Sequence, residues 1–556
     1  MDNYEIADQF SLLSKLMDIH GDNSFKAKSY AVAAFTIEKL PEQLTSIPAQ
    51  KIFSIKGIGE SVGKKIIELI ETNELGVLKE YLEKTPKGVL EMLQIKGIGP
   101  KKIATIWKEL EIETLGELLY ACNENRLLLY KGFGEKTQKN IKDAIEFYFN
   151  NIGSYLYQQV EQIVDIFQHQ LQKNFPDCFF DISGEYKRQL EIIEKLEWVT
   201  NANASVLKNF FEKNDYKLVA EQAAYISFKG KENLTIGFYL ATNNRYKVLF
   251  TTSSSEDFLQ AWNKKFGEIE PTVTSEEIIF SAHQLPFIPA YLRESTSILE
   301  KATTNSIAHI IQPKDIKGII HSHSNWSDGV NSIEEMANAC IERQLEYLVI
   351  SDHSKAAFYA NGLSEERITQ QHALIESLNK RLAPFTIYKS IECDILNDGS
   401  LDYDDEVLAS FDLVIASIHS NLKMNEEKAM MRLIKAIENP FTSILGHMTG
   451  RLLLSRNGYP VNHKKVIDAC AANNVVIELN AHPRRLDIDW RWIDYALTKN
   501  VLISIDPDAH AIEGFADCKY GVLVAQKAGL TITNNLSSFS KKEFEAFLIQ
   551  QHHKRN

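Results

Sequence analysis

The chain has 556 residues, 44% of them hydrophobic, and a formal net charge of −13. This length exceeds what one hydrophobic core can organise and predicts roughly two to four domains. The sequence holds no run of about 18 apolar residues that could cross a bilayer and no N-terminal secretory signal, so we expect a cytoplasmic protein with no membrane partner. The six cysteines never form a Cys-x-x-Cys pair, which argues against a disulfide framework and against a cysteine zinc site.

Residues 1–150 read as short amphipathic helices and contain a repeated glycine motif. The sequence IKGIG occurs at 55–59 and again at 95–99, and a weaker copy, KGFG, follows at 131–134. In each copy a predicted helix with lysines near its start comes directly after the glycines. This pattern resembles the helix–hairpin–helix motif.

The glycine motif favours DNA binding through the phosphate backbone. Glycines let backbone N–H groups approach a phosphate, and the start of the following helix favours the anion, so DNA is held without its sequence being read. The region is nearly neutral, with 20 Lys and Arg against 22 Asp and Glu. The alternative is a glycine turn with a purely structural role. The residues expected to contact DNA are Gly57, Gly59, Lys64, Lys65, Gly97, Gly99, Lys101, Lys102, Gly132 and Gly134.

Residues 151–300 alternate helix-like and strand-like stretches, which predicts an α+β domain. The expected strands are CFFDISG (178–184), YISFKG (225–230), LTIGFYLA (234–241) and YKVLFTT (246–252). A connector with two prolines follows around Leu285–Arg293.

From about Asp315 onward, short apolar strands alternate with helical stretches, which predicts a barrel-like α/β domain. Polar side chains follow these strands at the points where they end. They are His321 and His323, Asp352 and His353, Glu392, His419, His447, and Asp508 and His510. Because the carboxyl ends of parallel strands converge on one face of a barrel, we expect these side chains to meet.

Imidazoles and carboxylates without a thiolate suit Mn, Fe or Zn. A pair such as His321 and His323 can share one metal, since both side chains point to the same face of the strand. Glu392 could bridge two metals, and two metals together can clamp a phosphate and supply a hydroxide nucleophile. A structural or surface histidine is the alternative at any single strand end, but the repetition over many strand ends favours a multinuclear phosphoesterase site.

The segments HSHSNWSDG (321–329), SDHSKAAFYANGLSEERI (351–368), IECDILNDGSLDYDDEVL (391–408), ASIHS (416–420), GHMTGRLL (446–453) and DPDAH (506–510) resemble the PHP domain of bacterial family X DNA polymerases. The resemblance implies a distorted TIM-like barrel and nine ligands for two or three divalent metals, with Mn²⁺ or Zn²⁺ expected. The implied ligands are His321, His323, Asp328, His353, Glu392, His419, His447, Asp508 and His510. Lys355, Arg451 and Arg485 lie in matching stretches and are candidates to hold substrate phosphate, with surface salt bridges as the alternative.

Residues 1–150 resemble the lyase-type and fingers subdomains of the same family. A lysine on the helix after the first hairpin forms a Schiff base with an abasic sugar in that family, and the matching position here is Lys65. We favour the alternative, an exposed lysine on a helix that faces DNA.

The palm motif of the family is altered in this chain. Gly184 and the basic pair Lys187 and Arg188 are kept, but Glu185 stands in place of the family serine. The family's Asp-x-Asp pair aligns with Lys195 and Glu197, and its third aspartate aligns with Gly237.

Loss of these carboxylates removes charge where two Mg²⁺ ions must sit, so we expect a palm without polymerase chemistry. A shifted alignment is the alternative, because Asp181, Glu191 and Glu194 lie nearby.

The sequence thus predicts an all-α helix–hairpin–helix domain (1–150), a nucleotidyltransferase-like palm and thumb (151–300) and a PHP phosphoesterase (315–556). We expect a monomeric 3′–5′ exonuclease that processes gapped, nicked or 3′-ended DNA during repair. An active polymerase with an auxiliary exonuclease is the main alternative, and nucleotide incorporation on gapped DNA separates the two. A DNA-binding scaffold and a small-molecule phosphatase are further alternatives, which the intact ligand set and the hairpins respectively disfavour.

Overall fold

The computed structural model describes residues 1, 3–38, 40, 42–95, 97–149, 153–230, 233–304, 307 and 309–555. The chain divides into two compact units, which are described separately below. The first unit consists of Met1–Asn123 and Leu127–Glu146, and the second of Glu124–Arg126 and Phe147–Asn556. None of the described helices is long and apolar enough to cross a membrane.

The first unit is entirely helical, as the sequence predicts. Its first two helices, α1 (Asn3–His20) and α2 (Ser24–Glu38), pack against each other through buried side chains such as Phe10 and Tyr30. The helices that follow are α3 (Ala49–Ile52), α4 (Glu60–Thr72), α5 (Gly76–Lys84), α6 (Lys87–Met92), α7 (Pro100–Lys108), α8 (Leu115–Asn123) and α9 (Glu135–Phe149).

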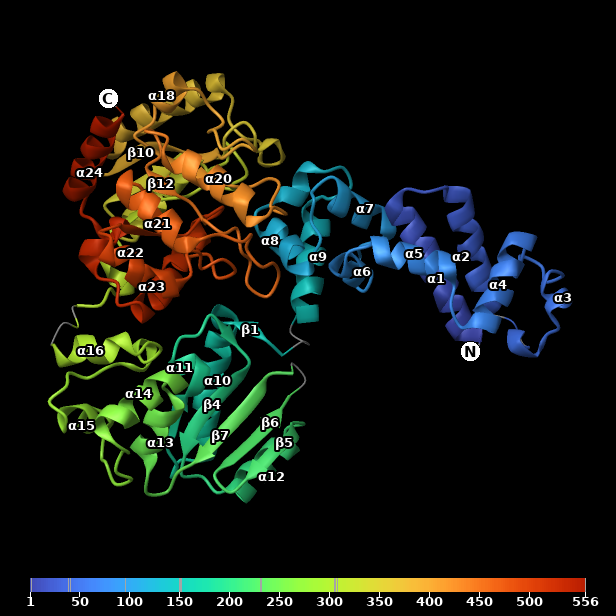
Figure 1. Ribbon diagram of the computed structural model, residues 1–556, viewed down its shortest axis with the longest axis horizontal. Coiled ribbons are helices and arrows are strands. Elements are labelled where there is room, and N and C mark those ends of the chain that lie inside the picture. The colour runs from blue at the N-terminus through green and yellow to red at the C-terminus, as the bar shows by residue number, and fades with distance from the viewer. Residues whose placement is uncertain are drawn as a thin grey trace. The chain divides into compact units, whose positions relative to one another are not determined.

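The second unit begins with a five-stranded mixed sheet in the order β2-β4-β7-β6-β5 (Figure 1). Its strands are β2 (Phe180–Ser183), β4 (Lys195–Thr200), β5 (Lys217–Gln222), β6 (Tyr225–Lys229) and β7 (Thr235–Leu240). β4 and β7 are parallel, and the other neighbours are antiparallel. Trp198, Phe211 and Phe238 are buried between this sheet and the helices α10 (Tyr157–Asn174) and α12 (Ala204–Lys213). Short elements complete this part, namely β1 (Tyr155–Leu156), α11 (Gly184–Lys187) and β3 (Ile192–Ile193).

The expected strand at 246–252 is wrong, because these residues belong to helix α13 (Arg245–Thr252). Leu249 and Phe250 are buried, and Phe250 packs against Trp262 and Phe280 from other helices. This tertiary packing overrides the local strand preference of the Val, Phe and Thr residues. Trp262 lies on α14 (Glu256–Phe266) and Phe280 on α15 (Glu276–Ser281), and α16 (Ser297–Thr303) adds side chains to the same hydrophobic cluster.

The C-terminal part, residues 309–555, is built on seven parallel strands in the order β14-β13-β12-β11-β10-β9-β8. The strands are β8 (Gly318–Ile319), β9 (Tyr347–Ile350), β10 (Thr386–Asp394), β11 (Leu413–Ser417), β12 (Ile444–Leu445), β13 (Val476–Asn480) and β14 (Ile503–Asp506). The helices of this part lie around the strands (Figure 1). They are α17 (Ile333–Glu342), α18 (Glu365–Leu382), α19 (Asp405–Leu408), α20 (Glu426–Ile437), α21 (His463–Ala472), α22 (Ile493–Thr498), α23 (Cys518–Lys527) and α24 (Lys541–Lys554).

The parallel sheet curves into a near-barrel, since a parallel bridge between Ser322 and Ala509 joins the segments that follow the first and last strands. Both faces of the strands are buried, as parallel sheets require. On β9, Leu348 and Ile350 face one hydrophobic cluster, and Tyr347 and Val349 face another that includes side chains of α24. The predicted fold class is therefore confirmed: a helical hairpin region, a mixed sheet and a parallel near-barrel.

Candidate metal centre

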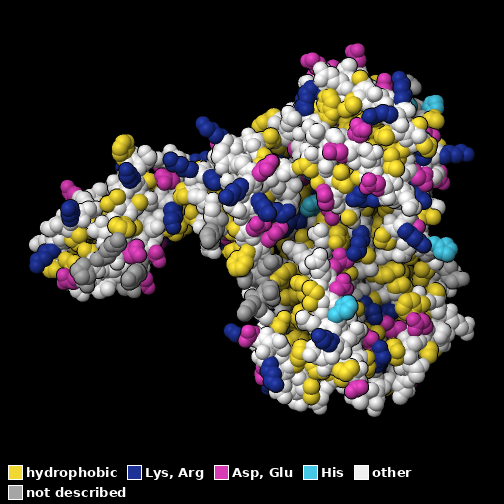
Figure 2. Space-filling view, turned by 180° about the vertical axis from the view of Figure 1, so that it is seen from behind, with side chains coloured by type: hydrophobic (Ala, Val, Ile, Leu, Met, Phe, Trp, Pro, Cys, Tyr) yellow, Lys and Arg dark blue, Asp and Glu magenta, His cyan; other side chains and the backbone are white. Residues whose placement is uncertain are grey.

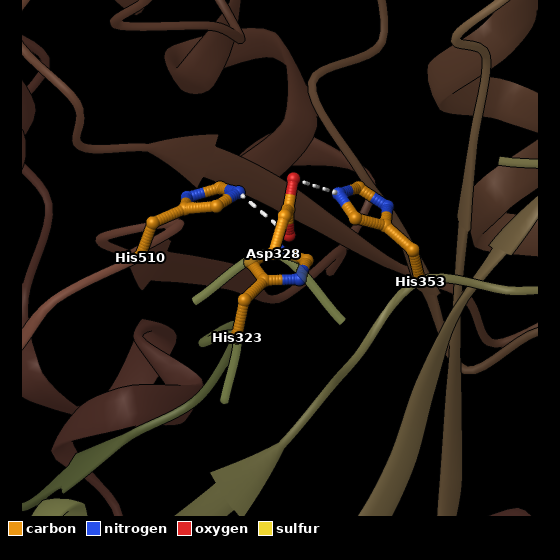
Figure 3. A group of neighbouring side chains, drawn as sticks. All are labelled: His323, Asp328, His353 and His510. Carbon is orange, nitrogen blue, oxygen red and sulfur yellow. Dashed lines mark ion pairs between the residues drawn. The ribbon is translucent and has the colours of Figure 1, made fainter. Parts of the chain in front are cut away.

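The carboxyl ends of six of the seven strands, all except β13, bring the expected ligands together at one edge of the near-barrel. Among the residues that the structure describes, three groups of side chains have ligand atoms within 4.8 Å of one another, and all three lie in the C-terminal part. The groups are His323, Asp328, His353 and His510; His321, His323, Glu392 and Asp508; and His353, Glu392 and His419. His323, His353 and Glu392 each belong to two groups, so the three positions form one continuous centre. In Figure 3, Asp328 lies between His510 and His353, with His323 beside it.

Glu392, near the end of β10, is the hub of the centre. Its Oε1 atom lies 3.0 Å from His419 Nε2 and 2.9 Å from His447 Nε2. His321 Nε2 is 3.3 Å from the same oxygen, and His353 Nδ1 is 3.0 Å from Oε2. One carboxylate that reaches this many imidazoles is placed to bridge metals.

Asp508 and Asp328 complete the ligand set. Asp508 Oδ1 lies 3.1 Å from His323 Nε2 and 3.5 Å from His321 Nε2. Asp328 contacts His510 Nε2 at 3.4 Å and His353 Nε2 at 3.6 Å. The structure therefore places all nine sequence-predicted ligands in contact with at least one other member of the set.

The backbone is strained at two of the ligands. His321 has a φ of 22° and Asp508 a φ of 51°, both in the left-handed region that non-glycine residues avoid. Such strain persists where the surrounding structure fixes the backbone, and it gathers at functional sites. Here the bridge between Ser322 and Ala509 fixes both segments.

A second set of buried carboxylates holds the ligands in place. Glu478 on β13 accepts a hydrogen bond from His321 Nδ1, and Asp394 on β10 accepts one from His419 Nδ1 at 3.3 Å. Sequence reasoning missed both residues. Each is an acidic residue inside or at the end of an apolar strand, which is the signal that could have revealed them.

Asp352 fixes the segment that carries Asp328. Its carboxylate accepts hydrogen bonds from the backbone N–H of Ser324 at 2.8 Å, from the hydroxyls of Ser324 and Ser327, and from Gln371 at 2.6 Å. The sequence placed Asp352 at a strand end, and the structure gives it this supporting position rather than that of a ligand.

The buried charges shift the pKa values of the ligands in opposite directions. Burial, together with His510 and His353, lowers the pKa of His323 to about 3, so this ring is neutral and available as a ligand. Burial opposes the charge on Glu392, but His419 and His321 hold its pKa well below the usual value. Burial likewise opposes the charge on His419, yet Glu392 and Asp394 raise its pKa to about 10. A metal that binds His419 must therefore displace the proton that this ring carries at neutral pH.

The donor atoms fit metal ions. Both carboxylate oxygens of Asp328, both ring nitrogens of His353 and Nε2 of His510 are buried and make no hydrogen bond within the described part of the chain. Buried polar atoms in native proteins are almost always satisfied, so these atoms call for a ligand. Their nitrogen and oxygen chemistry suits Mn, Fe or Zn.

The three expected phosphate-binding residues lie at different depths. Arg485 is 4% exposed, and its Nε lies 3.5 Å from Asp508 Oδ2. Arg451 donates hydrogen bonds to the backbone carbonyl of Arg485 at 2.9 Å and to Asp489 at 2.6 Å. Lys355 is exposed and pairs with Glu365 at 2.6 Å. The structure thus brings only Arg485 against a ligand, and the phosphate-binding role of all three stays a prediction.

The mixed sheet places the altered palm positions side by side. Glu197 on β4 pairs in register with Gly237 on β7. Glu197 is buried, which raises the pKa of its carboxyl, and it accepts hydrogen bonds from Tyr225 and Tyr239 at 3.2 Å each. A Cβ atom at Gly237 would lie 2.4 Å from the Tyr225 hydroxyl, so this tyrosine fills the space that a side chain at position 237 would need.

Two further acidic residues near this position have protein partners. Glu185 on α11 accepts the backbone N–H groups of Glu194 at 2.7 Å and Lys195 at 3.1 Å. Asp181 on β2 forms a bidentate pair with Arg245, with both contacts at 2.6 Å.

The three glycine hairpins share one backbone geometry. Gly57, Gly97 and Gly132 have φ values of 96°, 94° and 96°, which only glycine adopts without strain. Gly59 and Gly99 are the N-caps of α4 and α7 and have extended backbones. The first N–H groups of each following helix are thus presented at the surface, where a phosphate can approach.

The lysines after the hairpins differ in their surroundings. Lys64 is exposed and pairs with Glu60 at 2.7 Å, Lys65 is half-buried, and Lys102 lies 5.7 Å from the centre of the Phe133 ring. Gly134 directly precedes α9, and Lys101 is exposed on α7. On the face shown in Figure 2, basic and acidic side chains are interspersed, in keeping with the near-neutral charge of residues 1–150.

Comparisons with known proteins match three parts of the chain to family models. Residues 1–75 match the helix-hairpin-helix domain, residues 89–146 match the SAM-like helix-hairpin-helix tandem, and residues 320–482 match the PHP domain. A probable phosphatase of Caldanaerobacter subterraneus is 25% identical over 171 residues, which cover 29% of this chain and 60% of that protein. A probable phosphatase of Clostridium botulinum is 30% identical over 108 residues, or 18% of this chain and 40% of that protein.

A full-length relative is also found. The DNA polymerase/3′-5′ exonuclease PolX of Bacillus subtilis is 33% identical over 563 aligned positions, which cover 96% of each chain. The similarity extends through the hairpins, the mixed sheet and the metal centre, whereas the phosphatases match only part of the chain. This chain therefore belongs to the PolX family of DNA polymerase/3′-5′ exonucleases.

Proposed function

We propose that this chain degrades DNA from its 3′ end at the PHP metal centre and that its palm adds no nucleotides. The convergence of nine metal-ligand side chains around Glu392 carries the first half of the proposal. We further propose that two or three Mn²⁺ or Zn²⁺ ions occupy the centre, since its donors are imidazoles and carboxylates. Metals bound there would activate a water molecule and neutralise charge on the scissile phosphate.

The residues of the chain prepare this chemistry in four ways. Glu392 and Asp328 supply charge where cations must lie, and Glu478 holds the ring of His321 in one orientation. Arg485 lies against Asp508, where its guanidinium can reach a phosphate oxygen that approaches the centre. The hydrogen bonds of Asp352 keep the segment with Asp328 from moving away.

The hairpins make DNA the proposed substrate. Three copies of one backbone geometry present helix starts that suit phosphate groups. The Bacillus subtilis relative is named a 3′-5′ exonuclease, which supports cleavage from the 3′ end. A small-molecule phosphatase would have no use for these hairpins.

The absence of nucleotide addition rests on the palm-like sheet. Glu197 is bonded to two tyrosines, Tyr225 occupies the space beside Gly237, and Glu185 is bonded to backbone N–H groups. Two hydrated Mg²⁺ ions beside a triphosphate need several free carboxylates. A working polymerase remains the second candidate, because the relative is named a DNA polymerase and is 33% identical.

A primed, gapped DNA with Mn²⁺ or Mg²⁺ and all four nucleotides separates the two candidates. We expect shortening of the primer and no extension. His321→Ala or Asp508→Ala should abolish the shortening and reveal no synthesis. Template-dependent extension by either variant, lost again in Glu197→Gln, would show that the palm is active.

A further inference from the structure

An aromatic side chain stands in solvent on the loop that follows a metal ligand. Phe358 is 78% exposed, and among the described large hydrophobic residues only Phe25 is more exposed. It lies in the short helical turn Phe358–Ala360, between His353 and α18. Large aromatic side chains are usually at least half-buried, so this exposure calls for a partner.

The loop is fixed to the metal centre at its base. Leu363 donates its backbone N–H to the carbonyl of His353 at 2.9 Å, and a parallel bridge joins Ser354 to Leu363. Ala356 donates its N–H to Asp402 at 2.6 Å. These contacts therefore hold the backbone of the Phe358 loop in place relative to the ligand His353.

The loop is also tied to the segment that carries Asp328. Asn361 donates to the carbonyl of Trp326 at 3.2 Å, and Arg367 donates to the carbonyl of Asn361 at 2.8 Å and to that of Trp326. Trp326 itself packs against the hydrophobic core, unlike the exposed Phe358. Two loops that carry ligands thus support one exposed ring.

The neighbour of Phe358 is fixed by contacts on its ring. The Tyr359 ring meets the Phe358 ring edge to face, with centroids 5.8 Å apart and an interplanar angle of 78°. The guanidinium of Arg126 lies 4.9 Å from the centre of the Tyr359 ring. Tyr359 therefore has a cationic partner of its own, and the Phe358 ring packs beside it.

We propose that Phe358 is the platform of a nucleobase subsite, on which the base of the 3′-terminal nucleotide stacks while its phosphodiester lies at the metal centre. This inference rests on the proposed exonuclease function. An exposed, anchored ring offers a flat apolar face to any of the four bases, and stacking of this kind tolerates every sequence. Stacking on Phe358 would let the enzyme bind the terminal nucleotide of any 3′ end without base-specific hydrogen bonds.

The test uses the full-length protein with Mn²⁺ and two 5′-labelled single-stranded oligonucleotides. One ends in an ordinary nucleotide, and the other ends in an abasic sugar joined by the same phosphodiester. Phe358→Ala should raise KM about tenfold for the ordinary end and change it less than twofold for the abasic end. Phe358→Trp should restore the preference of the wild type. Ile549→Ala, an exposed apolar residue on α24, is the matched control and should change neither substrate.

Equal effects of Phe358→Ala on the two substrates, or no effect on either, would overturn the subsite. An unchanged thermal midpoint shows that the variant is folded, as the exposure of Phe358 leads us to expect. If the wild-type protein cleaves neither oligonucleotide, the proposed exonuclease function itself fails, and this result is distinct from the others.

Discussion

Glu478 on β13 and His321 beyond β8 form a buried hydrogen-bonded pair, although 157 residues separate them in the sequence. The Glu478 carboxylate accepts a hydrogen bond from Nδ1 of His321. The other ring nitrogen, Nε2, therefore faces Glu392 at 3.3 Å. The same carboxylate accepts the backbone N–H of His447 at 2.5 Å. One carboxylate outside the expected ligand set thus orients two segments that carry ligands.

Removing the charge of this carboxylate should weaken metal binding. We expect Glu478→Gln to lower the affinity for Mn²⁺ by about 10–100-fold, the usual effect of losing a group that orients a ligand. Calorimetric titration of metal into the apo-protein measures this change. Glu438→Gln, an exposed residue after α20, is the control and should leave the affinity unchanged. An unaltered affinity in Glu478→Gln would mean that the pair is only structural.

The hub residue should determine how many metals bind. Glu392 contacts His321, His353, His419 and His447, so its amide variant loses the charge shared by these positions. We expect Glu392→Gln to hold at most one metal and to lose nearly all hydrolysis of DNA. Elemental analysis after loading with Mn²⁺ or Zn²⁺ gives the count. A wild-type protein that never loads more than one metal would contradict the multinuclear centre.

The hairpin glycines allow a test in which only the backbone angle differs. An added Cβ at Gly97 or Gly99 meets no heavy atom within 4 Å, but Gly97 has a φ of 94° and Gly99 a φ of −91°. Gly97→Ala should therefore cost about 1–2 kcal/mol of local stability and weaken DNA binding, whereas Gly99→Ala should keep the hairpin intact.

Fluorescence anisotropy at several salt concentrations measures the DNA affinity, since phosphate contacts make it salt-dependent. Hydrolysis of a small phosphodiester should be the same in both glycine variants, because the metal centre is untouched. Equal DNA affinity in both variants would reduce the hairpins to structural turns.

A half-buried histidine outside the metal centre should make stability fall in acid. His372 on α18 packs edge-on against Phe411, and burial, followed by Lys389, lowers its pKa to about 4 from 6.5. A folded-state pKa below the unfolded value means that the unfolded chain binds the proton first, so stability is lost as the pH falls below 6.5. Between pH 7.5 and 5 the loss should be at most about 2 kcal/mol, and smaller because solvent screens a ring that is only partly buried.

His372→Phe should remove this part of the acid sensitivity. Denaturant titrations of the wild-type and variant proteins at the two pH values give the difference, and acid effects at the metal centre cancel between them. His553→Gln, an exposed histidine on α24, is the control. Identical pH dependence in wild type and His372→Phe would show that protonation of this ring does not lower the free energy of unfolding.

Much of this protein follows from local sequence. A polar residue after an apolar strand marks the carboxyl end of that strand, and parallel strands align those ends, so eight of the nine expected ligands could be predicted without coordinates. Asp328 was implied only by the resemblance to the PHP domain. The hairpins could be predicted from the sequence as well, because Gly57 and Gly97 have backbone angles that only glycine adopts without strain. Both features depend on backbone geometry, which a short stretch of sequence specifies.

The tertiary structure alone decided which side chains meet. Neither the pairing of Glu478 with His321 nor the filling of the space beside Gly237 by Tyr225 is encoded in any short motif. The helix that replaces the expected strand at 246–252 exists because Phe250 finds partners on other helices. Contacts between residues far apart in sequence depend on how whole elements pack, and packing is a property of the folded chain rather than of any segment.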